Sequence, residues 1–278
     1  MPEALINGAR IYYQEHGKGP PLVLSHGLGS DHTMWLLQAR ELRDRFRVVL
    51  WDFRGHGRSE ITEEGYSLEM FVSDLRGLLR YLGIEEAHIG GLSLGGLVAW
   101  SFALAFPEMT RSLVISDSAG LLEGMSEKEK EDKQKLFETS AAVAKKDGRS
   151  RMADATISLM FSEKFIKSRP DLVEQVKSGI MADPGQGYAR TIEHLLLNFW
   201  KRPEDEVKED LGRISTSCLV LAGELDQLTP LPTQQALHRS IPGSRFVLIK
   251  GAGHVPCLEK PGEWNRAVLE FLSSVEGG

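Results

Sequence analysis

Short apolar runs alternate along this chain with longer amphipathic stretches, which is the pattern of strands separated by covering helices. The apolar runs are continuous and rich in β-branched and aliphatic residues, as in parallel strands buried on both faces. The predicted strands of this kind are Leu22–Ser25, Arg47–Trp51, Ala87–Gly90, Ser112–Ser116, Cys218–Ala222 and Arg245–Ile249. Helices are predicted at Met34–Asp44, Ser67–Leu82, Ser93–Phe106, Thr233–Ser240 and Trp264–Ser274. The pattern therefore predicts an α/β fold with a mostly parallel central sheet flanked by helices.

A hairpin is predicted at the start of the sheet. Asn7-Gly8 separates two short runs with strand character, Ala4–Ile6 and Arg10–Glu15. Asn-Gly favours the two-residue turns with positive φ angles that join antiparallel strands. We therefore expect the sheet to begin with an antiparallel edge.

The alternation stops between about Leu121 and Leu211, where several helical patterns follow one another and no run has strand character. We expect residues 1–120 and 212–278 to form the α/β core and residues 121–211 to form an inserted helical cap. The charged run Ser126–Lys135, near the start of this insertion, is typical of a solvated helix face.

Composition and charge restrict the partners of this chain. The 278 residues have a formal net charge of −6, and acidic and basic side chains are mixed, without the basic stripe that binds nucleic acid. The two cysteines, Cys218 and Cys257, are too few for a disulfide framework or a cysteine metal site. The first residues do not resemble a signal peptide, and no apolar run approaches the ~20 residues of a membrane span. We expect a cytoplasmic protein with neither nucleic acid nor a membrane as partner.

The segment Gly90–Gly96 places a serine between a predicted strand and a predicted helix. Its sequence, Gly-Gly-Leu-Ser-Leu-Gly-Gly, contains the pattern Gly-x-Ser-x-Gly centred on Ser93. In that context the serine is held in a strained turn that lifts its hydroxyl above the sheet, and the residues two positions away must lack side chains. Ser93 is therefore the candidate nucleophile, with Gly91 and Gly95 as its necessarily small neighbours. The segment fits neither of the glycine-rich nucleotide-binding patterns.

Four motifs, in this order, resemble those of the α/β-hydrolase superfamily. They are Ser25–Gly29 (Ser-His-Gly-Leu-Gly), Trp51–Ser59 (Trp-Asp-Phe-Arg-Gly-His-Gly-Arg-Ser), the Ser93 segment and Gly251–His254 (Gly-Ala-Gly-His). The resemblance covers nearly the whole chain outside the insertion. It implies the α/β-hydrolase fold and a catalytic serine, acid and histidine in that order along the chain.

A serine hydroxyl needs a base that takes its proton and an acid that orients the base. His254 follows the last predicted strand in a glycine-rich loop and resembles the catalytic histidine of the superfamily. Asp226, just after Cys218–Ala222, matches the usual family position of the acid, and Asp117, after the preceding strand, is the alternative. The expected catalytic residues are therefore Ser93, Asp226 and His254.

Two backbone amides are expected to form the oxyanion hole of such a site. They are the amide of Leu94, directly after the nucleophile, and that of Leu28, in the loop after the first parallel strand. Their N–H groups would stabilise the negative charge that develops on the substrate oxygen.

Several polar residues near these motifs are expected to have structural roles. His26 and His56 lie in glycine-rich loops and are expected to bond the loop backbone rather than transfer protons. Asp52 ends a strand but precedes the serine, so we expect it to brace Arg54 and the glycine turn.

The identity of the nucleophile restricts the reaction. Haloalkane dehalogenases and epoxide hydrolases of this superfamily use a carboxylate, so Ser93 argues against both. The motifs are similar to those of small serine carboxylesterases and enol-lactonases, which implies acyl transfer to water through an acyl-enzyme without metal or cofactor. The expected partner is a small-molecule ester or lactone. Carbon–carbon bond hydrolases and small-ligand receptors of the same fold are the alternatives.

The insertion is expected to limit the size of the substrate. It follows one predicted strand and precedes the next, so both of its ends lie on the catalytic side of the sheet. Its apolar residues Met125, Met160, Phe161 and Phe199 are candidates for the pocket wall. A closed apolar pocket with few fixed charges is predicted, which suits esters of small to medium size.

Overall fold

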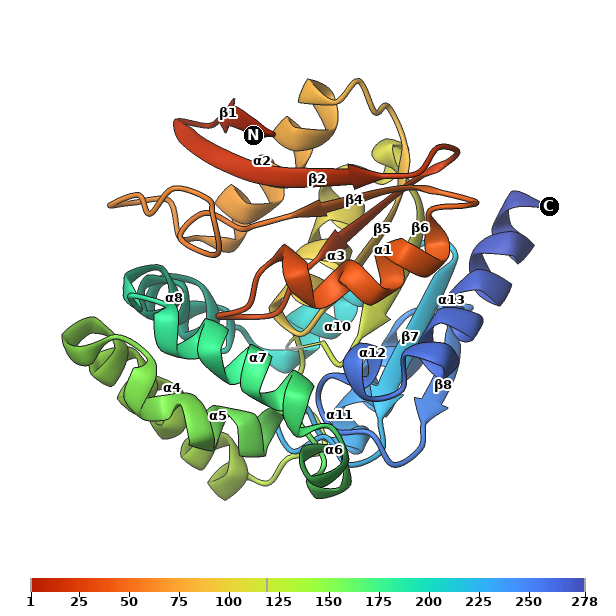
Figure 1. The fold of residues 1–278 in the computed structure, drawn as a ribbon. Helices are drawn as coiled ribbons and strands as arrows, with labels where there is room; N and C mark the ends of the chain where they lie inside the picture. The colour runs from red at the N-terminus through yellow and green to blue at the C-terminus, as the bar shows by residue number, and fades with distance from the viewer. Residues whose placement is uncertain (1, 119, 278) are drawn as a thin grey trace.

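The computed structural model describes residues 2–118 and 120–277, and the strands in this part of the chain form one central sheet (Figure 1). The sheet has eight strands in the order β1-β2-β4-β3-β5-β6-β7-β8. The strands are β1 Glu3–Ile6, β2 Ala9–His16, β3 Pro21–Ser25, β4 Arg47–Trp51, β5 Ala87–Leu92, β6 Thr110–Ser116, β7 Cys218–Gly223 and β8 Arg245–Ile249. Strands β3 to β8 are parallel, and β2 is antiparallel to both β1 and β4. The predicted parallel sheet and its antiparallel edge are both confirmed.

The strand order reverses beside β3. From β3 the chain moves to β4 on one side and later crosses back to β5 on the other side. Open α/β sheets bind ligands at the carboxyl ends of strands at such a switch point. The loops that follow β3 and β5 contain Leu28 and Ser93, so the fold brings these two segments together at this edge.

Helices cover both faces of the sheet, and each face has its own apolar core. One face is covered by α1 (Leu36–Leu42) and α13 (Pro261–Glu276), and the other by α2 (Leu68–Tyr81), α3 (Leu94–Ala105) and α11 (Leu231–Ser240). Three short helices complete the core, η1 His32–Trp35, η2 Pro107–Met109 and α12 Pro256–Glu259. Alternate residues of the strands enter alternate cores: Leu22 and Leu24 face α1 and α13, and Val23 faces α2 and α3.

The hairpin between β1 and β2 is fastened to α2 by a hydrogen bond to a carboxylate that also forms a buried ion pair. Asn7 and Gly8 have positive φ angles of 46° and 76°, as expected for an Asn-Gly turn. Asn7 Nδ2 donates to Asp74 Oδ1 of α2 over 2.9 Å, and the Arg54 guanidinium donates to both oxygens of the same carboxylate at 2.6 and 2.8 Å. The expected contact of Asp52 with Arg54 is therefore wrong, because the Arg54 side chain extends to α2.

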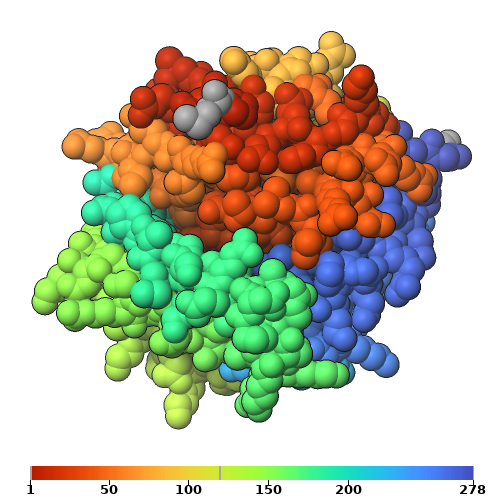
Figure 2. Space-filling view, in the orientation of Figure 1, coloured from red at the N-terminus to blue at the C-terminus, as the bar shows by residue number. Residues whose placement is uncertain are grey.

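The segment between β6 and β7 has no strand among its described residues and consists of successive helices. They are α4 Glu127–Asp147, η3 Ser150–Met152, α5 Ala153–Met160, α6 Glu163–Ser168, α7 Pro170–Ala182, α8 Gln186–Thr191, η4 Ile192–Leu196, α9 Leu197–Phe199 and α10 Glu204–Gly212. Figure 1 shows α4 to α8 gathered on one side of the molecule, and in Figure 2 their green atoms form a continuous surface against the orange N-terminal part. None of the helices in residues 2–118 and 120–277 has the length and apolarity needed to cross a membrane.

The charged run at the start of α4 is exposed apart from Lys130, which is half-buried, and one buried residue. Ser126 and Glu129 form a capping box that starts the helix, and Gly148, with a φ angle of 70°, ends it. The buried residue is Lys133, whose exposed fraction is 9%. The predicted solvated face is thus correct for the run as a whole and wrong for this lysine.

Candidate active site

Ser93 lies at the turn between β5 and α3. Its φ and ψ angles of 56° and −114° fall outside the regions that residues with side chains normally adopt. Such a conformation costs on the order of 1–3 kcal/mol and persists only where the surroundings fix it. Here the Ser93 N–H donates to the Ser116 carbonyl at the end of β6 over 3.0 Å. The strained turn predicted for Ser93 is confirmed, and it places the residue at the N-terminus of α3, where partial positive charge favours an anion.

Two glycines allow the backbone around Ser93 to approach its neighbours closely. A Cβ atom on Gly91 would lie 2.3 Å from the carbonyl carbon of Gly95, and one on Gly95 would lie 2.1 Å from the Ser25 carbonyl oxygen. The prediction that both positions need glycine is confirmed. Because Ser25 ends β3, the Gly95 contact also fixes the distance between the Ser93 turn and the loop that contains Leu28.

His254 and Asp226 form a buried pair on neighbouring loops. His254 lies between β8 and α12, Asp226 follows β7, and His254 Nδ1 is 2.8 Å from Asp226 Oδ2. Burial alone would raise the pKa of Asp226, but the ion pair with His254 and hydrogen bonds from Thr229 outweigh it and lower this pKa to about 2. Asp226 is therefore a carboxylate at neutral pH.

Thr229 contacts both members of this pair and was not among the predicted site residues. Its Oγ1 donates to Asp226 Oδ2 over 2.5 Å and lies 3.4 Å from His254 Nδ1, and its N–H donates to Asp226 Oδ1 over 3.0 Å. The Leu228 N–H donates to the same oxygen over 2.8 Å. In a common type of turn, an aspartate side chain accepts hydrogen bonds from the backbone N–H groups two and three residues later. The position of Thr229, three residues after Asp226, is therefore the sequence signal that could have identified it as a site residue.

Asp117, the alternative acid, bonds to the sheet instead of the histidine. Its Oδ1 accepts from the Gly223 N–H over 2.7 Å, and its Oδ2 accepts from the Ser116 hydroxyl over 2.8 Å. Burial and the neighbouring Asp226 carboxylate raise the pKa of Asp117 well above its usual value. The geometry therefore favours Asp226 over Asp117 as the partner of His254.

The amides of Leu28 and Leu94 are available as donors near Ser93. Leu94 is the first residue of α3, and no acceptor within residues 2–118 and 120–277 receives either amide proton. The Leu28 loop is held from outside, because Arg149 Nη1 donates to the Gly29 carbonyl over 2.5 Å. Two free donors beside a serine hydroxyl are what an oxyanion hole would require.

His26 and His56 bond the loop backbone, as expected. His26 Nε2 accepts from the Phe53 N–H over 3.0 Å, and its Nδ1 is 2.7 Å from the Gly27 carbonyl oxygen. Burial lowers the pKa of His26 to about 3, so this ring is neutral. His56 Nδ1 is 3.1 Å from the Arg54 carbonyl oxygen.

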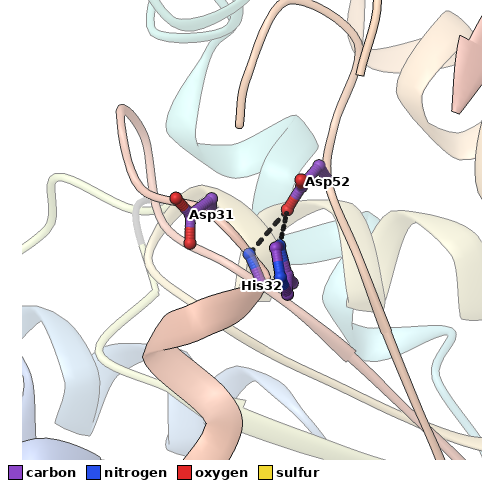
Figure 3. A group of neighbouring side chains, drawn as sticks. All are labelled: Asp31, His32 and Asp52. Atoms are coloured by element: carbon purple, nitrogen blue, oxygen red, sulfur yellow. Dashed lines mark hydrogen bonds and ion pairs between the residues drawn. The ribbon is translucent and has the colours of Figure 1, made fainter. Parts of the chain in front are cut away.

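Asp31, His32 and Asp52 form a second cluster of ionisable groups, beside the loop after β3 (Figure 3). Asp52 Oδ1 accepts from the His32 N–H over 2.6 Å and is 2.8 Å from His32 Nδ1, and Asp52 Oδ2 accepts from the Arg58 N–H over 2.8 Å. Asp31 accepts from the Thr33 N–H over 2.7 Å and so caps η1. Since these carboxylates already serve backbone donors, the cluster fastens the loops after β3 and β4. The part of the prediction in which Asp52 braces the glycine turn is confirmed.

A cavity lies between the helical segment and the carboxyl ends of the strands. Ser93, His254 and Leu28 line it from the core, and α4, α5 and α8 line it from the opposite side. Of the four expected wall residues, Met160 lines the cavity. The expectation is wrong for the others: Phe161 stacks on Phe165, Phe199 packs against Trp100, and Met125 lies in the turn before α4. The spacing of apolar residues along a helix shows which side chains are buried, but it does not show which of them border the cavity.

Lys133 and Arg149 also line this mostly apolar cavity. Sequence reasoning missed both, because a charged run gives no sign of which side chain turns inward. The Arg149 guanidinium is 4.2 Å from the centre of the Tyr188 ring, and its Nη1 is 2.8 Å from Asp183 Oδ2. The cavity, which was expected to have few fixed charges, thus has two cations on its wall.

Glu259 connects the helical segment with the loop of His254. Its Oε1 accepts from the Gly253 N–H over 2.7 Å and from the Ser162 N–H over 3.1 Å. Its Oε2 accepts from the Ser162 hydroxyl over 2.5 Å. Ser162 caps α6, so one carboxylate bonds both the start of that helix and the residue before His254.

Comparisons with known proteins agree with this fold. The family model described as alpha/beta hydrolase fold matches residues 20–261. The chain is 28% identical to 3-oxoadipate enol-lactonase 2 of Acinetobacter baylyi over 249 residues, which cover 90% of this chain and 87% of that protein. It is 30% identical to a putative carbamate hydrolase RutD of Caulobacter sp. over 280 residues, which cover 98% of both chains.

Two solved structures resemble the chain over nearly its whole length. The enol-lactonase from Burkholderia xenovorans superposes with a TM-score of 0.88 at 26% identity and covers 98% of this chain and 100% of that chain. A thermophilic esterase from Thermogutta terrifontis superposes with a TM-score of 0.85 at 30% identity and covers 98% of both.

The close contact at the nucleophile turn predicts that Gly95 cannot be replaced. Gly95→Ala should lower the free energy of unfolding by about 3 kcal/mol, since its Cβ would overlap the Ser25 backbone. Gly212→Ala is the control, because a Cβ on Gly212 meets nothing within 4 Å. Urea denaturation measures both. A Gly95→Ala protein as stable as the control would contradict the contact.

Proposed function

The chain belongs to the α/β-hydrolase family and is a hydrolase, and we propose that it cleaves carboxylic esters of small to medium size through an acyl-enzyme on Ser93. The observation that supports this most is the shared cavity. Ser93, in its strained turn, and His254, bonded to Asp226, line the same space. A nucleophile, a base and an orienting acid are the groups that acyl transfer requires.

The first half of the proposed reaction forms the acyl-enzyme. His254 Nδ1 donates to Asp226, which leaves Nε2 free to take the proton of the Ser93 hydroxyl. Ser93 Oγ then attacks the ester carbonyl carbon, and the carbonyl oxygen becomes an oxyanion that the Leu28 and Leu94 amides stabilise. When the carbon–oxygen bond of the ester breaks, His254 returns the proton to the departing alcohol.

The second half repeats these steps with water. His254 takes a proton from a water molecule, whose oxygen attacks the acyl carbon, and the same amides stabilise the second oxyanion. The bond to Ser93 Oγ breaks, Oγ regains a proton from His254, and the carboxylic acid leaves. Asp226 stays ionised throughout and stabilises the protonated imidazole.

We also propose the division of the chain that this reaction implies. Residues 1–120 and 212–278 supply the catalytic groups, and residues 121–211 act as a cap that excludes water and limits substrate size. The support is that α4, α5 and α8 line the cavity opposite Ser93.

A lactone is the second candidate substrate. A lactone is a cyclic ester and reacts with the same groups, except that the alcohol stays attached to the acyl chain. The enol-lactonase relative and the enol-lactonase structure favour this candidate. Turnover of an aryl ester, an enol-lactone and a carbamate by the same preparation distinguishes the three substrate classes.

The nucleophile assignment predicts the effect of Ser93→Ala. This variant should lose ester hydrolysis while its melting temperature stays close to that of the wild type, because the hydroxyl contributes to chemistry and not to packing. A fluorophosphonate should label Ser93 in the wild type. Activity close to wild type in purified Ser93→Ala would overturn the mechanism, and a single slow turnover with a persistent adduct would indicate a receptor instead.

The acid assignment predicts unequal effects of two conservative changes. Asp226→Asn should reduce kcat by about 10⁴-fold, the loss typical when the orienting acid of a triad is neutralised. Asp117→Asn, the matched control, should reduce it far less, because Asp117 bonds Gly223 and Ser116 rather than His254. Steady-state kinetics on one aryl ester measures both, and a reversed order would move the role to Asp117.

The cavity beneath the helical segment predicts a preference for acyl chain length. Turnover across a series of p-nitrophenyl esters should be highest for short to medium chains and fall for long ones, because helices close the side opposite Ser93. Preference for long-chain emulsified lipid would show that the segment opens as a lipase lid and would refute the size limit.

A further inference from the structure

Lys133 is one of the residues that line the cavity containing Ser93 and His254, and its ammonium group lies beside Leu228, which also lines it. It lies on α4 and is buried, whereas its neighbours Asp132 and Gln134 are exposed. Its Nζ donates to the Leu228 carbonyl over 2.6 Å. An ammonium group has three N–H donors, so this carbonyl uses one of them.

The charge of Lys133 has no bonded counter-ion among residues 2–118 and 120–277. Its other described neighbour is the Trp200 ring, whose centre is 5.2 Å from Nζ. By contrast, Lys130, one turn earlier, pairs with Glu127 and Glu204 at 3.0 and 3.2 Å. The other cation of the cavity, Arg149, is paired as well. Within the described part of the chain, Lys133 is thus the cavity cation that no carboxylate contacts directly.

A buried ammonium without a counter-ion opposes folding. Taking it out of water costs free energy that a carbonyl and an aromatic ring offset only in part. Burial accordingly lowers the pKa of Lys133 to about 8, although attraction to Asp226 acts in the opposite direction. Asp226 is already bonded to His254 and Thr229 and does not form a direct ion pair with Lys133. An anion that enters the cavity would meet a desolvated cation with free donors.

We propose that Lys133 binds a carboxylate of the substrate, so that the preferred substrates are small esters or lactones with a carboxylate group. This inference rests on the proposed function, because it concerns the substrate that Ser93 attacks. Lys133 is then a specificity-determining residue, and the apolar wall receives the carbon chain between the carboxylate and the ester.

A matched pair of esters tests this proposal. p-Nitrophenyl hydrogen glutarate and p-nitrophenyl valerate have acyl chains of equal length and differ in the terminal carboxylate. In Lys133→Met, kcat/KM for the glutarate ester should fall about 10- to 100-fold, mainly through KM, as expected for loss of a charged hydrogen bond. The valerate ester should change little. Lys133→Arg should retain part of the preference, and Lys135→Met, an exposed lysine on the same helix, should retain all of it.

The ratio of the two kcat/KM values should also depend on pH. It should be highest below pH 8, where Lys133 is protonated, and fall as the pH rises through about 8. The other ionisable groups around the cavity, Asp226, His254, Arg149 and Tyr188, act in both reactions, so the ratio isolates Lys133. In Lys133→Met the ratio should be flat over the same range.

A binding measurement separates this proposal from the proposed function. Calorimetric titration with glutarate should show binding to the wild type and at least tenfold weaker binding to Lys133→Met, whether or not any ester is cleaved. Equal affinity for both proteins, or no binding to either, overturns the proposal. So does an unchanged ester ratio in a folded Lys133→Met, because Lys133 would then only support the Leu228 carbonyl.

Discussion

The close contact between Gly95 and the Ser25 carbonyl is the constraint on which the rest of the site depends. It is a contact between two backbones, from the end of β3 and the start of α3, and it leaves no room for a side chain. It joins the two loops that flank the switch point of the sheet. The spacing between Ser93 and the Leu28 amide is therefore set by the sheet and its first loops rather than by flexible side chains. Strain in the Ser93 backbone is the cost of this arrangement, and the bond to Ser116 helps to maintain it.

Some ionisable groups around the site hold the backbone in place, and others bond to His254 or lie beside that bond. Asp52 and Asp74 use their oxygens to hold loops and a helix, and His26 is kept neutral within the loop backbone. Asp226 and Asp117 are neighbours whose pKa values move in opposite directions, because the first bonds a histidine and the second is buried beside it. Asp226 therefore favours its charged form and Asp117 its neutral form, so the two neighbouring carboxyl groups do not repel each other.

Most of the fold could be predicted from the sequence, because its elements depend on residues that lie close together along the chain. Strands such as Arg47–Trp51 are continuous apolar runs, the Asn7-Gly8 turn depends on two residues, and the Ser93 turn depends on five. The partner of Arg54 and the inward turn of Lys133 could not be predicted, because both depend on how helices are oriented in space. The same holds for Phe161 and Phe199, which the pattern identifies as buried without showing what they face.

The bonds of Glu259 have a consequence for how the helical segment and the loop of His254 can move. One carboxylate bonds the start of α6 and also Gly253, the residue before His254. A displacement of α6 would therefore also pull on Gly253 and on the loop that holds His254. The position of this part of the helical segment and the position of the His254 ring are mechanically linked. Exchange of the helical segment for one from a relative would preserve this link only if the new segment again offered Glu259 a hydroxyl and an N–H where Ser162 now stands.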